Sequence, residues 1–303
     1  MTPSTASVFF AFFPYGGNGA TSAEHPCLRA WFANTLLKCK RDPRIGNVFM
    51  EDLSDTPITM TRNRAVAQAK KVGADFLVMC DSDQYPDYEL GLGDPHARPF
   101  WDTSFDFAYE RKRRGLATVV GAPYCGPPPR ENVYVFRWAA WQSEHPNVDF
   151  RLESYAREEA AGLAGIHPAA ALPTGLILFD LAVFDLVKPP YFYYEYTDET
   201  ESEKASTEDV TATRDLSLAG QELWGYSPIF CNWDAWAGHH KPKCVGKPRL
   251  VSADNVNEKY RDAVLQNRKA REHLHFVHRH EMPAYLISTL SVNHKSILLK
   301  ETP

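Results

Sequence analysis

The chain has 303 residues, of which 44% are hydrophobic, and it carries a formal net charge of −5 at pH 7. This length supplies a large core, arranged as one big domain or two small ones, and the negative charge excludes the global basic field of a general nucleic-acid binder. Basic clusters at residues 38–41, 111–114 and 268–280 are therefore interpreted as solvated helix faces, with a docking surface for a polyanion as the alternative.

The first 120 residues alternate between predicted strands and helices, as in a parallel α/β sheet. The predicted strands are residues 8–13, 47–50 and 75–80, and the predicted helices are residues 26–40 and 62–73. Thr59 or Thr61 would cap the second helix, and Gly73 marks its end. The strands are continuously apolar, so both faces of the sheet should be covered. Ligands bind such sheets at the carboxyl ends of the strands, where 14-PYGGNG-19 and 81-DSD-83 both lie.

Beyond residue 120 the pattern is less regular. The stretches 91–100, 126–130 and 197–206 should be loops. Further strands are expected at residues 117–125, 132–138, 171–180 and 223–233, and further helices at residues 102–115 and 181–187, from Ser206 or Thr207 to about Gly220, and from Asn255 onward. Together these elements predict an α/β fold with a single mixed, mostly parallel sheet flanked by helices and a helical C-terminal extension.

Two carboxylates, Asp81 and Asp83, directly follow the buried strand 75–80. Two like charges this close repel each other, so folding alone gains nothing from them. Alternate residues of an extended turn can aim their oxygens at one point, and a hard cation such as Mn²⁺ or Mg²⁺ prefers carboxylate ligands. The pair therefore indicates a metal site, with simple capping of a surface turn as the alternative.

Several short motifs accompany this acidic pair in a fixed order. They are 61-TRNRA-65, 81-DSD-83, 174-TGLILFDLAVFDLV-187, 207-TEDV-210 and 233-WDAWAGHH-240. The ordered set resembles the glycosyltransferase A fold, especially family-2-like enzymes and related phage proteins, over roughly residues 8–245. No single motif is specific, but their order is.

The resemblance implies a metal site at the acidic pair. Asp83 would ligate the cation directly, while Asp81, with Ser82 in the same turn, would face the ribose or reach the metal through water. His239 would add a nitrogen ligand, with His240 as the second choice. For the two histidines the alternative is a surface turn.

The resemblance also implies a site for the nucleotide of a UDP- or GDP-sugar donor. Pro14 and Tyr15 lie where the family's first strand delivers the base, so Tyr15 would stack on it. Arg62 suits a diphosphate or base contact because its guanidinium binds in bidentate fashion, and Asn63 would hold the shape of the loop. The alternatives are ordinary packing for Tyr15 and a surface charge at a helix N-terminus for Arg62.

On the acceptor side, Glu208 and Asp209 are candidates for the general base that takes the proton of the acceptor hydroxyl. The alternative is capping of the helix that they begin, because a helix N-terminus favours anions. The resemblance places four more residues on this side: Thr174, Gly175, Trp233 and Asp234.

These observations predict a metal-dependent glycosyltransferase that moves a hexosyl or pentosyl unit to an acceptor hydroxyl. The acceptor would be a 5-hydroxymethylated pyrimidine in phage DNA, or a saccharide or lipid-linked saccharide in surface polysaccharide assembly. A non-catalytic sugar-nucleotide-binding protein is a further alternative, and a nucleotidyltransferase is disfavoured because 14-PYGGNGATS-22 has no Lys or Arg. Residues 1–250 would form the catalytic domain, with a Rossmann-like nucleotide-sugar half (1–120) and an acceptor half (121–250), and residues 251–303 the extension.

The six cysteines show no CxxC spacing, which indicates reduced thiols rather than a disulfide framework. No stretch approaches about 18 consecutive apolar residues, so no membrane span is expected. The first residues lack the basic segment of a signal peptide. We therefore expect a cytoplasmic protein, in the bacterial host if a phage encodes it.

Overall fold

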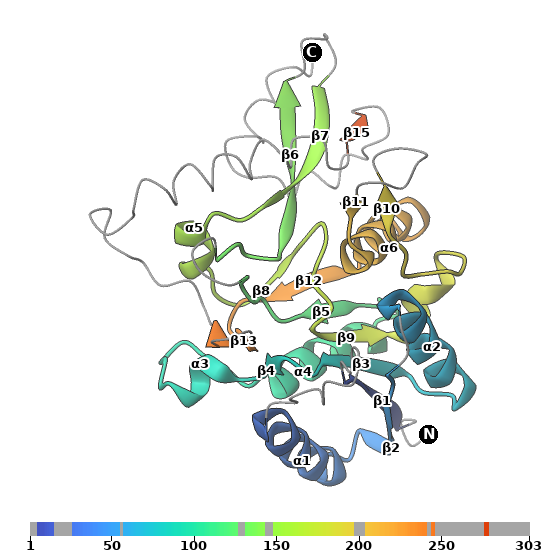
Figure 1. Ribbon diagram of the computed structural model, residues 1–303. Coiled ribbons are helices and arrows are strands. Elements are labelled where there is room, and N and C mark those ends of the chain that lie inside the picture. The colour runs from blue at the N-terminus through green and yellow to red at the C-terminus, as the bar shows by residue number, and fades with distance from the viewer. Residues whose placement is uncertain are drawn as a thin grey trace.

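The computed structural model of the protein describes residues 5–14, 26–54, 57–126, 131–142, 148–196, 204–240, 244–245 and 276–278. Within them a seven-stranded sheet forms the centre of the molecule (Figure 1). In spatial order its strands are β2 (Ile45–Asp52), β1 (Ala6–Phe13), β3 (Phe76–Asp81), β9 (Leu176–Asp180), β5 (Val119–Gly121), β12 (Ile229–Asn232) and β8 (Ile166–Pro168).

The sheet is mixed and mostly parallel, as the sequence predicts. Strands β2, β1, β3, β5 and β12 share one direction, whereas β9 and β8 run the opposite way. Because β9 is inserted in reverse between β3 and β5, its amino end lies beside the carboxyl ends of these two strands. One edge of the sheet thus gathers loops from distant parts of the chain.

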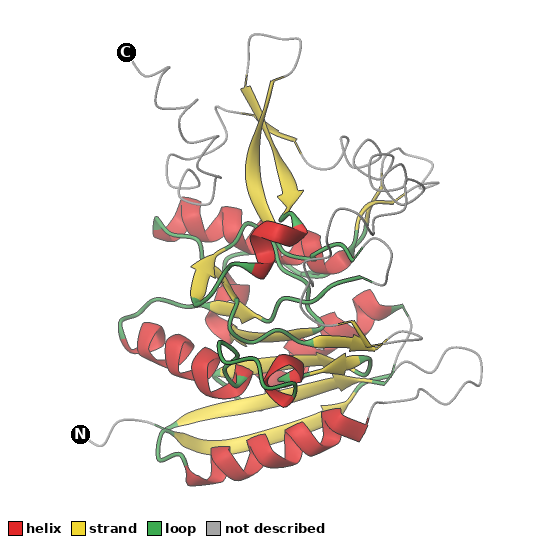
Figure 2. Ribbon diagram, turned by 90° about the vertical axis from the view of Figure 1, so that its left-hand side faces the viewer, coloured by secondary structure: helices red, strands yellow, loops and turns green. Residues whose placement is uncertain are grey.

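Helices cover both faces of the sheet (Figure 2). They are α1 (Pro26–Arg41) and α4 (Phe100–Arg113) on one face, and α2 (Ile58–Lys71) and α6 (Glu208–Trp224) on the other. Strand β1 shows why its sequence is continuously apolar. Phe9 and Phe13 pack into the core with α2 and α6, while Phe10 and Phe12 pack into the core with α1 and α4. Successive side chains of a strand point to opposite faces, so a doubly covered strand needs apolar residues throughout.

Smaller elements surround this core. A ribbon of β6 (Phe136–Gln142) and β7 (Val148–Ser154) projects from the main sheet in both views (Figures 1 and 2). The remaining elements are β4 (Gln84–Tyr85), β13 (Gly238–His240), β14 (Cys244–Val245), β10 (Glu195–Tyr196), β11 (Lys204–Ser206), β15 (Phe276–His278), the helices α3 (Tyr88–Gly91) and α5 (Arg157–Ala161), and the 3₁₀ helix η1 (Leu181–Asp185). None of the described helices has the length and apolar character that crossing a membrane requires.

The predicted boundaries need four corrections. Helix α2 begins at Ile58, after Pro57, and no side chain caps it, so Thr59 and Thr61 lie inside the helix. The strand expected at 223–233 starts only at Ile229, because α6 continues to Trp224. The strands expected at 117–125 and 171–180 are shorter than predicted, the strand expected at 132–138 lies instead at Phe136–Gln142, and β7 and β8 were missed.

The fourth correction concerns the segment from Asn255 onward, which the sequence predicts to be helical. Residues Phe276–His278 instead form a strand, β15, that pairs antiparallel with β7. Pairing with the edge of an existing ribbon overrides local helical periodicity here. The rest of this segment and residues 197–203 of the expected loop 197–206 lie outside the described residues. Residues 204–206 of that loop instead form strand β11, which pairs antiparallel with β10.

The close packing of α6 on the sheet can be tested at Gly220. A Cβ at this position would lie 2.5 Å from Cδ of Pro228 and 3.2 Å from the backbone oxygen of Tyr226. We expect Gly220→Ala to lower the free energy of unfolding by about 1–3 kcal/mol in urea denaturation, despite the better helix propensity of alanine. Gly91→Ala is the matched control, because a Cβ there meets nothing within 4 Å. Equal stability of the two variants would contradict the close approach.

Candidate functional site

Polar side chains gather at the edge where β1, β3 and β5 end and β9 begins. The backbone N–H of Asp81 donates to the oxygen of Gly175 (2.8 Å), and that of Ser82 donates to the oxygen of Phe13 (3.3 Å). These hydrogen bonds fix the acidic turn 81–83 between β1 and β9. The charged side chains of the candidate site lie around this turn.

An ionic triad joins the turn to two helices. Arg62 of α2 donates from Nη2 to both carboxylate oxygens of Asp81 (3.0 Å each) and from Nη1 to Oε1 of Glu208 (2.5 Å), at the start of α6. The guanidinium is buried, since Arg62 is only 4% exposed. A buried charge requires paired and hydrogen-bonded partners, and both carboxylates provide them.

The electrostatics of the triad are dominated by burial and by an excess of acids. Burial raises the pKa of Asp81, Arg62 lowers it, and the neighbouring charge of Asp83 raises it further. Burial likewise raises the pKa of Glu208, with Arg62 opposing and Asp209 adding to the shift. Burial disfavours the charge of Arg62, but these acids outweigh it and hold its pKa above the usual value. Arg62 pairs with two carboxylates, and the charges of Asp83 and Asp209 also lie near Asp81, so the site favours an additional cation.

A second pair, Asp83 and His239, lies beside the triad. Nε2 of His239 is 3.3 Å from Oδ2 of Asp83, and Nδ1 of the same ring lies 2.9 Å from the backbone oxygen of Cys125. An Nδ1–H that donates to this carbonyl leaves Nε2 facing the carboxylate, either as the lone pair of a neutral ring or as the N–H of an imidazolium that pairs with Asp83. A buried imidazole nitrogen whose other nitrogen is held by a carbonyl is the usual second-shell arrangement of a metal-ligating histidine.

This donor set fits a divalent cation. Asp83 supplies a hard oxygen and His239 an imidazole nitrogen, as Mn²⁺ accepts. The described residues contain no group of three or more His, Cys, Asp or Glu side chains arranged around one metal position, so the remaining ligands would come from substrate and water. Both oxygens of Asp81 face Arg62, and His240 follows His239 on β13, where neighbouring side chains point to opposite faces.

Asn63 contributes to the architecture of the site. Its Nδ2 donates to the backbone oxygens of Thr59 and Phe192 (2.8 Å each), and its Oδ1 accepts from the N–H groups of Tyr191 (2.8 Å) and Phe192 (3.2 Å). The side chain therefore ties the aromatic segment 191–192 to α2, next to Arg62.

The two acids at the start of α6 have different surroundings. Glu208 is buried against Arg62, whereas Oδ1 of Asp209 accepts from the N–H of Val210 (2.9 Å) and from the hydroxyl of Thr207. Thr207 is the N-cap residue of the helix, as the sequence predicts, but its side chain makes no capping hydrogen bond. Asp209 is thus the less constrained of the two carboxylates.

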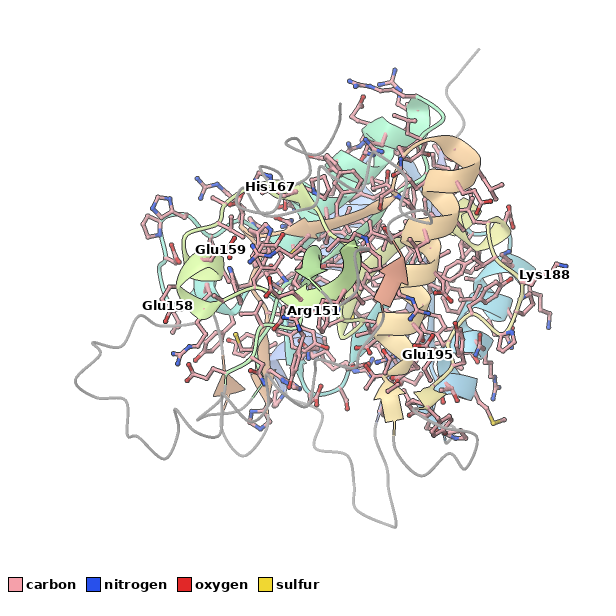
Figure 3. The ribbon with its side chains drawn as sticks, turned by 90° about the horizontal axis from the view of Figure 1, so that it is seen from above. Arg151, Glu158, Glu159, His167, Lys188 and Glu195 are labelled. Atoms are coloured by element: carbon pink, nitrogen blue, oxygen red, sulfur yellow. The ribbon has the colours of Figure 1, made fainter. Side chains whose placement is uncertain are left out.

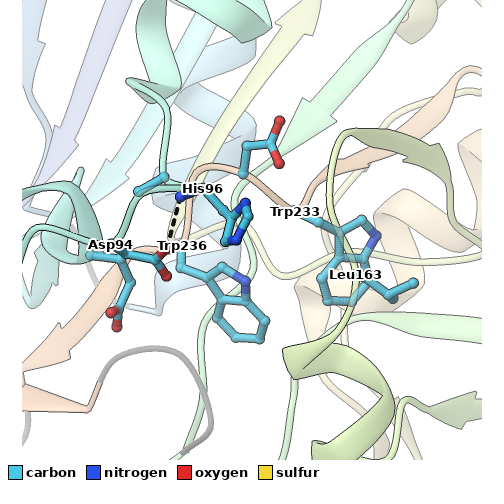
Figure 4. Close-up of a pocket in the computed structure, with 8 residues that line it drawn as sticks. Asp94, His96, Leu163, Trp233 and Trp236 are labelled. Atoms are coloured by element: carbon cyan, nitrogen blue, oxygen red, sulfur yellow. Dashed lines mark hydrogen bonds between the residues drawn. The ribbon is translucent and has the colours of Figure 1, made fainter.

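Trp233 and Asp234 lie elsewhere. The ring of Trp233 packs in the core, with its centroid 5.0 Å from that of Tyr155, and Asp234 accepts from the N–H of Gly165 (2.7 Å). Both line a small pocket that contains Asp94, His96, Leu163 and Trp236 (Figure 4). None of the residues that line this pocket belongs to the ionic triad or to the Asp83–His239 pair.

The sequence analysis missed Tyr124, which lies at the centre of the site. It follows β5, is 6% exposed, and has its ring centroid 5.0 Å from that of His239. Burial raises the pKa of its hydroxyl, and the nearby charges of Asp81 and Asp209 raise it further. The rule that ligands bind at strand carboxyl ends could have identified it, because it lies at the carboxyl end of the predicted strand 117–125.

Of the nucleotide-side residues, Pro14 is partly buried at the end of β1, and Tyr15 lies outside the described residues.

Comparisons with known proteins provide no family assignment. The sequence matches no family model and no curated protein. Similar solved structures include A197 from STIV (14% identity, TM-score 0.45, covering 82% of this chain and 97% of that chain). Others are a proposed glucose-1-phosphate thymidylyltransferase from Bacillus anthracis in complex with a sucrose (10%, 0.39, 77% and 89%) and a UDP-glucose pyrophosphorylase complexed with UDP-glucose (9%, 0.36, 88% and 100%). Similarity this low carries no argument about function.

The ionic triad should be a strong determinant of stability. Arg62→Met would leave Asp81 and Glu208 buried without their cation, and we expect a loss of about 3–5 kcal/mol in the free energy of unfolding. The control is Arg113→Met, which breaks a pair with Glu110 whose side chains are 63% and 51% exposed, and should change stability by less than ~0.5 kcal/mol. Urea denaturation of both variants measures the difference. Similar losses in the free energy of unfolding would show that the buried triad stabilises the fold no more than an exposed ion pair does.

Proposed function

We propose that the protein is a metal-dependent glycosyltransferase that uses a nucleoside-diphosphate sugar. The observation that carries the proposal is the Asp83–His239 pair, 3.3 Å apart, directly beside the buried ion pairs of Arg62 with Asp81 and Glu208. A cation-binding pair in an acid-rich strand edge suits the binding of a diphosphate, whose charge a divalent cation balances.

In this proposal, Asp83 and His239 hold Mn²⁺ or Mg²⁺, with Asp81 near it. The bound cation would stabilise the negative charge that grows on the departing nucleoside diphosphate. Arg62 keeps Asp81 oriented through two hydrogen bonds, and its positive charge balances part of the negative charge of the turn. Pro14, Tyr15 and Ser82 would contact the nucleotide of a UDP- or GDP-sugar.

Transfer requires a bond from the acceptor oxygen to the anomeric carbon while the bond from that carbon to the diphosphate breaks. The proton of the acceptor hydroxyl then needs a base. We assign this role to Asp209, because Glu208 is committed to Arg62 at 2.5 Å. Glu208 would act by holding Arg62 in place, and Thr174 and Gly175 remain proposed acceptor-side residues. Trp233 and Asp234, also expected on the acceptor side, line a separate pocket.

For the acceptor, the charge distribution favours a saccharide over hydroxymethylated DNA. Three of the seven cations in the clusters 38–41 and 111–114 are paired with acids: Lys38 with Asp102, Lys112 with Asp180, and Arg113 with Glu110. A DNA-binding face needs cations that are free to contact phosphates. The cluster 268–280 lies mostly outside the described residues.

The labelled side chains of Arg151, Lys188, Glu158, Glu159 and Glu195, seen from above, include both cations and acids (Figure 3). We propose a cytoplasmic location for an enzyme with this substrate, since nucleotide sugars are made there.

Metal binding tests the central pair. Asp83→Asn and His239→Ala should each weaken the binding of Mn²⁺, measured with UDP present by the electron paramagnetic resonance of free Mn²⁺, by roughly tenfold or more. His96→Ala is the control, because this histidine is exposed and belongs to another pocket. Unchanged affinity in both site variants, with thermal unfolding like that of the wild type, would refute the assignment.

Donor hydrolysis tests the reaction without knowledge of the acceptor. A panel of UDP- and GDP-sugars with Mn²⁺ should give slow release of free sugar and nucleoside diphosphate from at least one donor, and EDTA should abolish it. Asp209→Asn should keep this hydrolysis and lose transfer to saccharide acceptors by roughly 10²–10⁴-fold.

Two outcomes would count against the proposal. Formation of a nucleoside triphosphate from the donor and pyrophosphate would indicate nucleotidyl transfer instead. Binding of a donor without any turnover, in the presence of Mn²⁺ and saccharide or hydroxymethylated DNA acceptors, would indicate a non-catalytic binding protein.

A further inference from the structure

The aromatic segment that leads into β10 is attached to α6 on both sides of Tyr194. The hydroxyl of Tyr193 donates to Oδ2 of Asp215 (2.6 Å), and Arg214 donates to both carboxylate oxygens of Glu195 (2.6 and 2.9 Å). Asp215 and Arg214 belong to α6, so the segment lies beside this helix (Figure 1). The position of Tyr194 is therefore fixed by the residues before and after it.

A strand pairing brings the same segment to the first turn of α6. Strand β10 pairs antiparallel with β11, in which Glu195 lies opposite Ser206. Ser206 is the last residue of β11, and α6 begins two residues later at Glu208. Tyr194, which precedes Glu195, is thus held next to the chain that carries Glu208 and Asp209.

The charges of the candidate site act on the hydroxyl of Tyr194. Burial raises the pKa of this hydroxyl, the charge of Glu208 raises it further, and the charge of Arg62 lowers it. Asp209 also contributes to the increase. Tyr194 is therefore a protonated phenol at neutral pH, and it lies near the ionic triad and near the carboxylate to which we assign the role of base.

This part of the site is open to solvent, unlike the triad. Tyr194 and Asp209 are partly exposed, and Thr207 is exposed. Oδ1 of Asp209 accepts from the hydroxyl of Thr207 and from the N–H of Val210. Among the described residues no donor reaches Oδ2 of Asp209, so this oxygen can accept a hydrogen bond from a bound molecule.

The chemistry of this surface suits an uncharged sugar. An aromatic face packs against the C–H groups of a sugar ring, while the hydroxyls of the sugar remain for polar partners such as the carboxylate of Asp209. An anionic molecule would meet Glu208 and Asp209, and like charges placed together oppose binding. Arg62 and Arg214 do not offset this effect, because each is already bound to two carboxylates.

We propose that the ring of Tyr194 is a stacking platform for an uncharged sugar unit of the acceptor, which then presents its reacting hydroxyl to Asp209. This rests on the proposed function and specifies its acceptor as a saccharide that carries no charge on the reacting unit. Tyr194 binds and orients the acceptor in this assignment and takes no part in the proton transfer.

The test measures binding of the acceptor without turnover. Methyl glycosides and disaccharides of glucose, galactose, mannose and N-acetylglucosamine are titrated with Mn²⁺ and UDP or GDP present, and saturation-transfer NMR gives their dissociation constants. We expect at least one of them to bind the wild type, and Tyr194→Ala to weaken its binding roughly three- to tenfold, the size of one aromatic contact. Tyr226→Ala is the matched control, because this partly exposed tyrosine packs against Trp224 at the other end of α6.

A second variant separates the ring from its hydroxyl. Tyr194→Phe keeps the aromatic face, so the same saccharide should bind within about twofold of its affinity for the wild type. A loss as large as that of Tyr194→Ala would overturn stacking as the basis of binding. Unchanged binding in Tyr194→Ala would overturn the platform itself.

The remaining outcomes distinguish the platform from the proposed function. If the wild type hydrolyses a UDP- or GDP-sugar but binds none of these saccharides, the platform is wrong and the glycosyltransferase assignment stands. Binding of hydroxymethylated DNA that Tyr194→Ala weakens would show that the platform holds a base and overturn the saccharide. Absence of hydrolysis for every UDP- and GDP-sugar would overturn the proposed function.

Discussion

The arrangement of the site depends on one buried cation, the guanidinium of Arg62. It reaches Asp81 at the end of β3 and Glu208 at the start of α6, residues that are 19 and 146 positions away in the chain. Without this cation the two carboxylates would face each other in a poorly hydrated environment, where like charges repel strongly. The triad thus allows an acid-rich turn to exist at the carboxyl end of a buried strand.

The fold supplies the positions that the triad then connects. Parallel strands β1, β3 and β5 end at one edge, and the reversed strand β9 brings its amino end to the same place. The short pairing of β13 with β4 adds His239 beside Asp83, since His239 is directly opposite Gln84 in that pairing. Residues from separate parts of the chain therefore meet at one edge of the sheet.

Much of this was accessible from the sequence, and the reasons differ between residues. The continuous apolar runs at β1 and β3 predict doubly covered strands, and the position of Asp81 and Asp83 after β3 predicts their place at the ligand-binding edge. The partner of Asp81 was not predictable, because Arg62 at a helix start has an ordinary surface interpretation and only tertiary contact with Glu208 buries it. Tyr124 and Gln84 were not predictable, because no spacing rule marks a tyrosine after a strand or a glutamine after an acid. Both pack so closely against Gly175 that a side chain at that position would collide with them.

The hydrogen bonds of Asn63 have a consequence for how the aromatic segment can vary. All four go to main-chain atoms of Thr59, Tyr191 and Phe192, so these hydrogen bonds depend on the backbone conformation of the segment and not on its side chains. A substitution at position 191, which is partly exposed, can therefore change what the segment presents to a neighbouring molecule while its attachment to α2 persists, whereas Phe192 is buried in the core. Proline is the exception at either position, because it has no N–H to donate to the amide oxygen. The exposed side chain of the segment can therefore vary while the hydrogen bonds of its backbone to Asn63 stay the same.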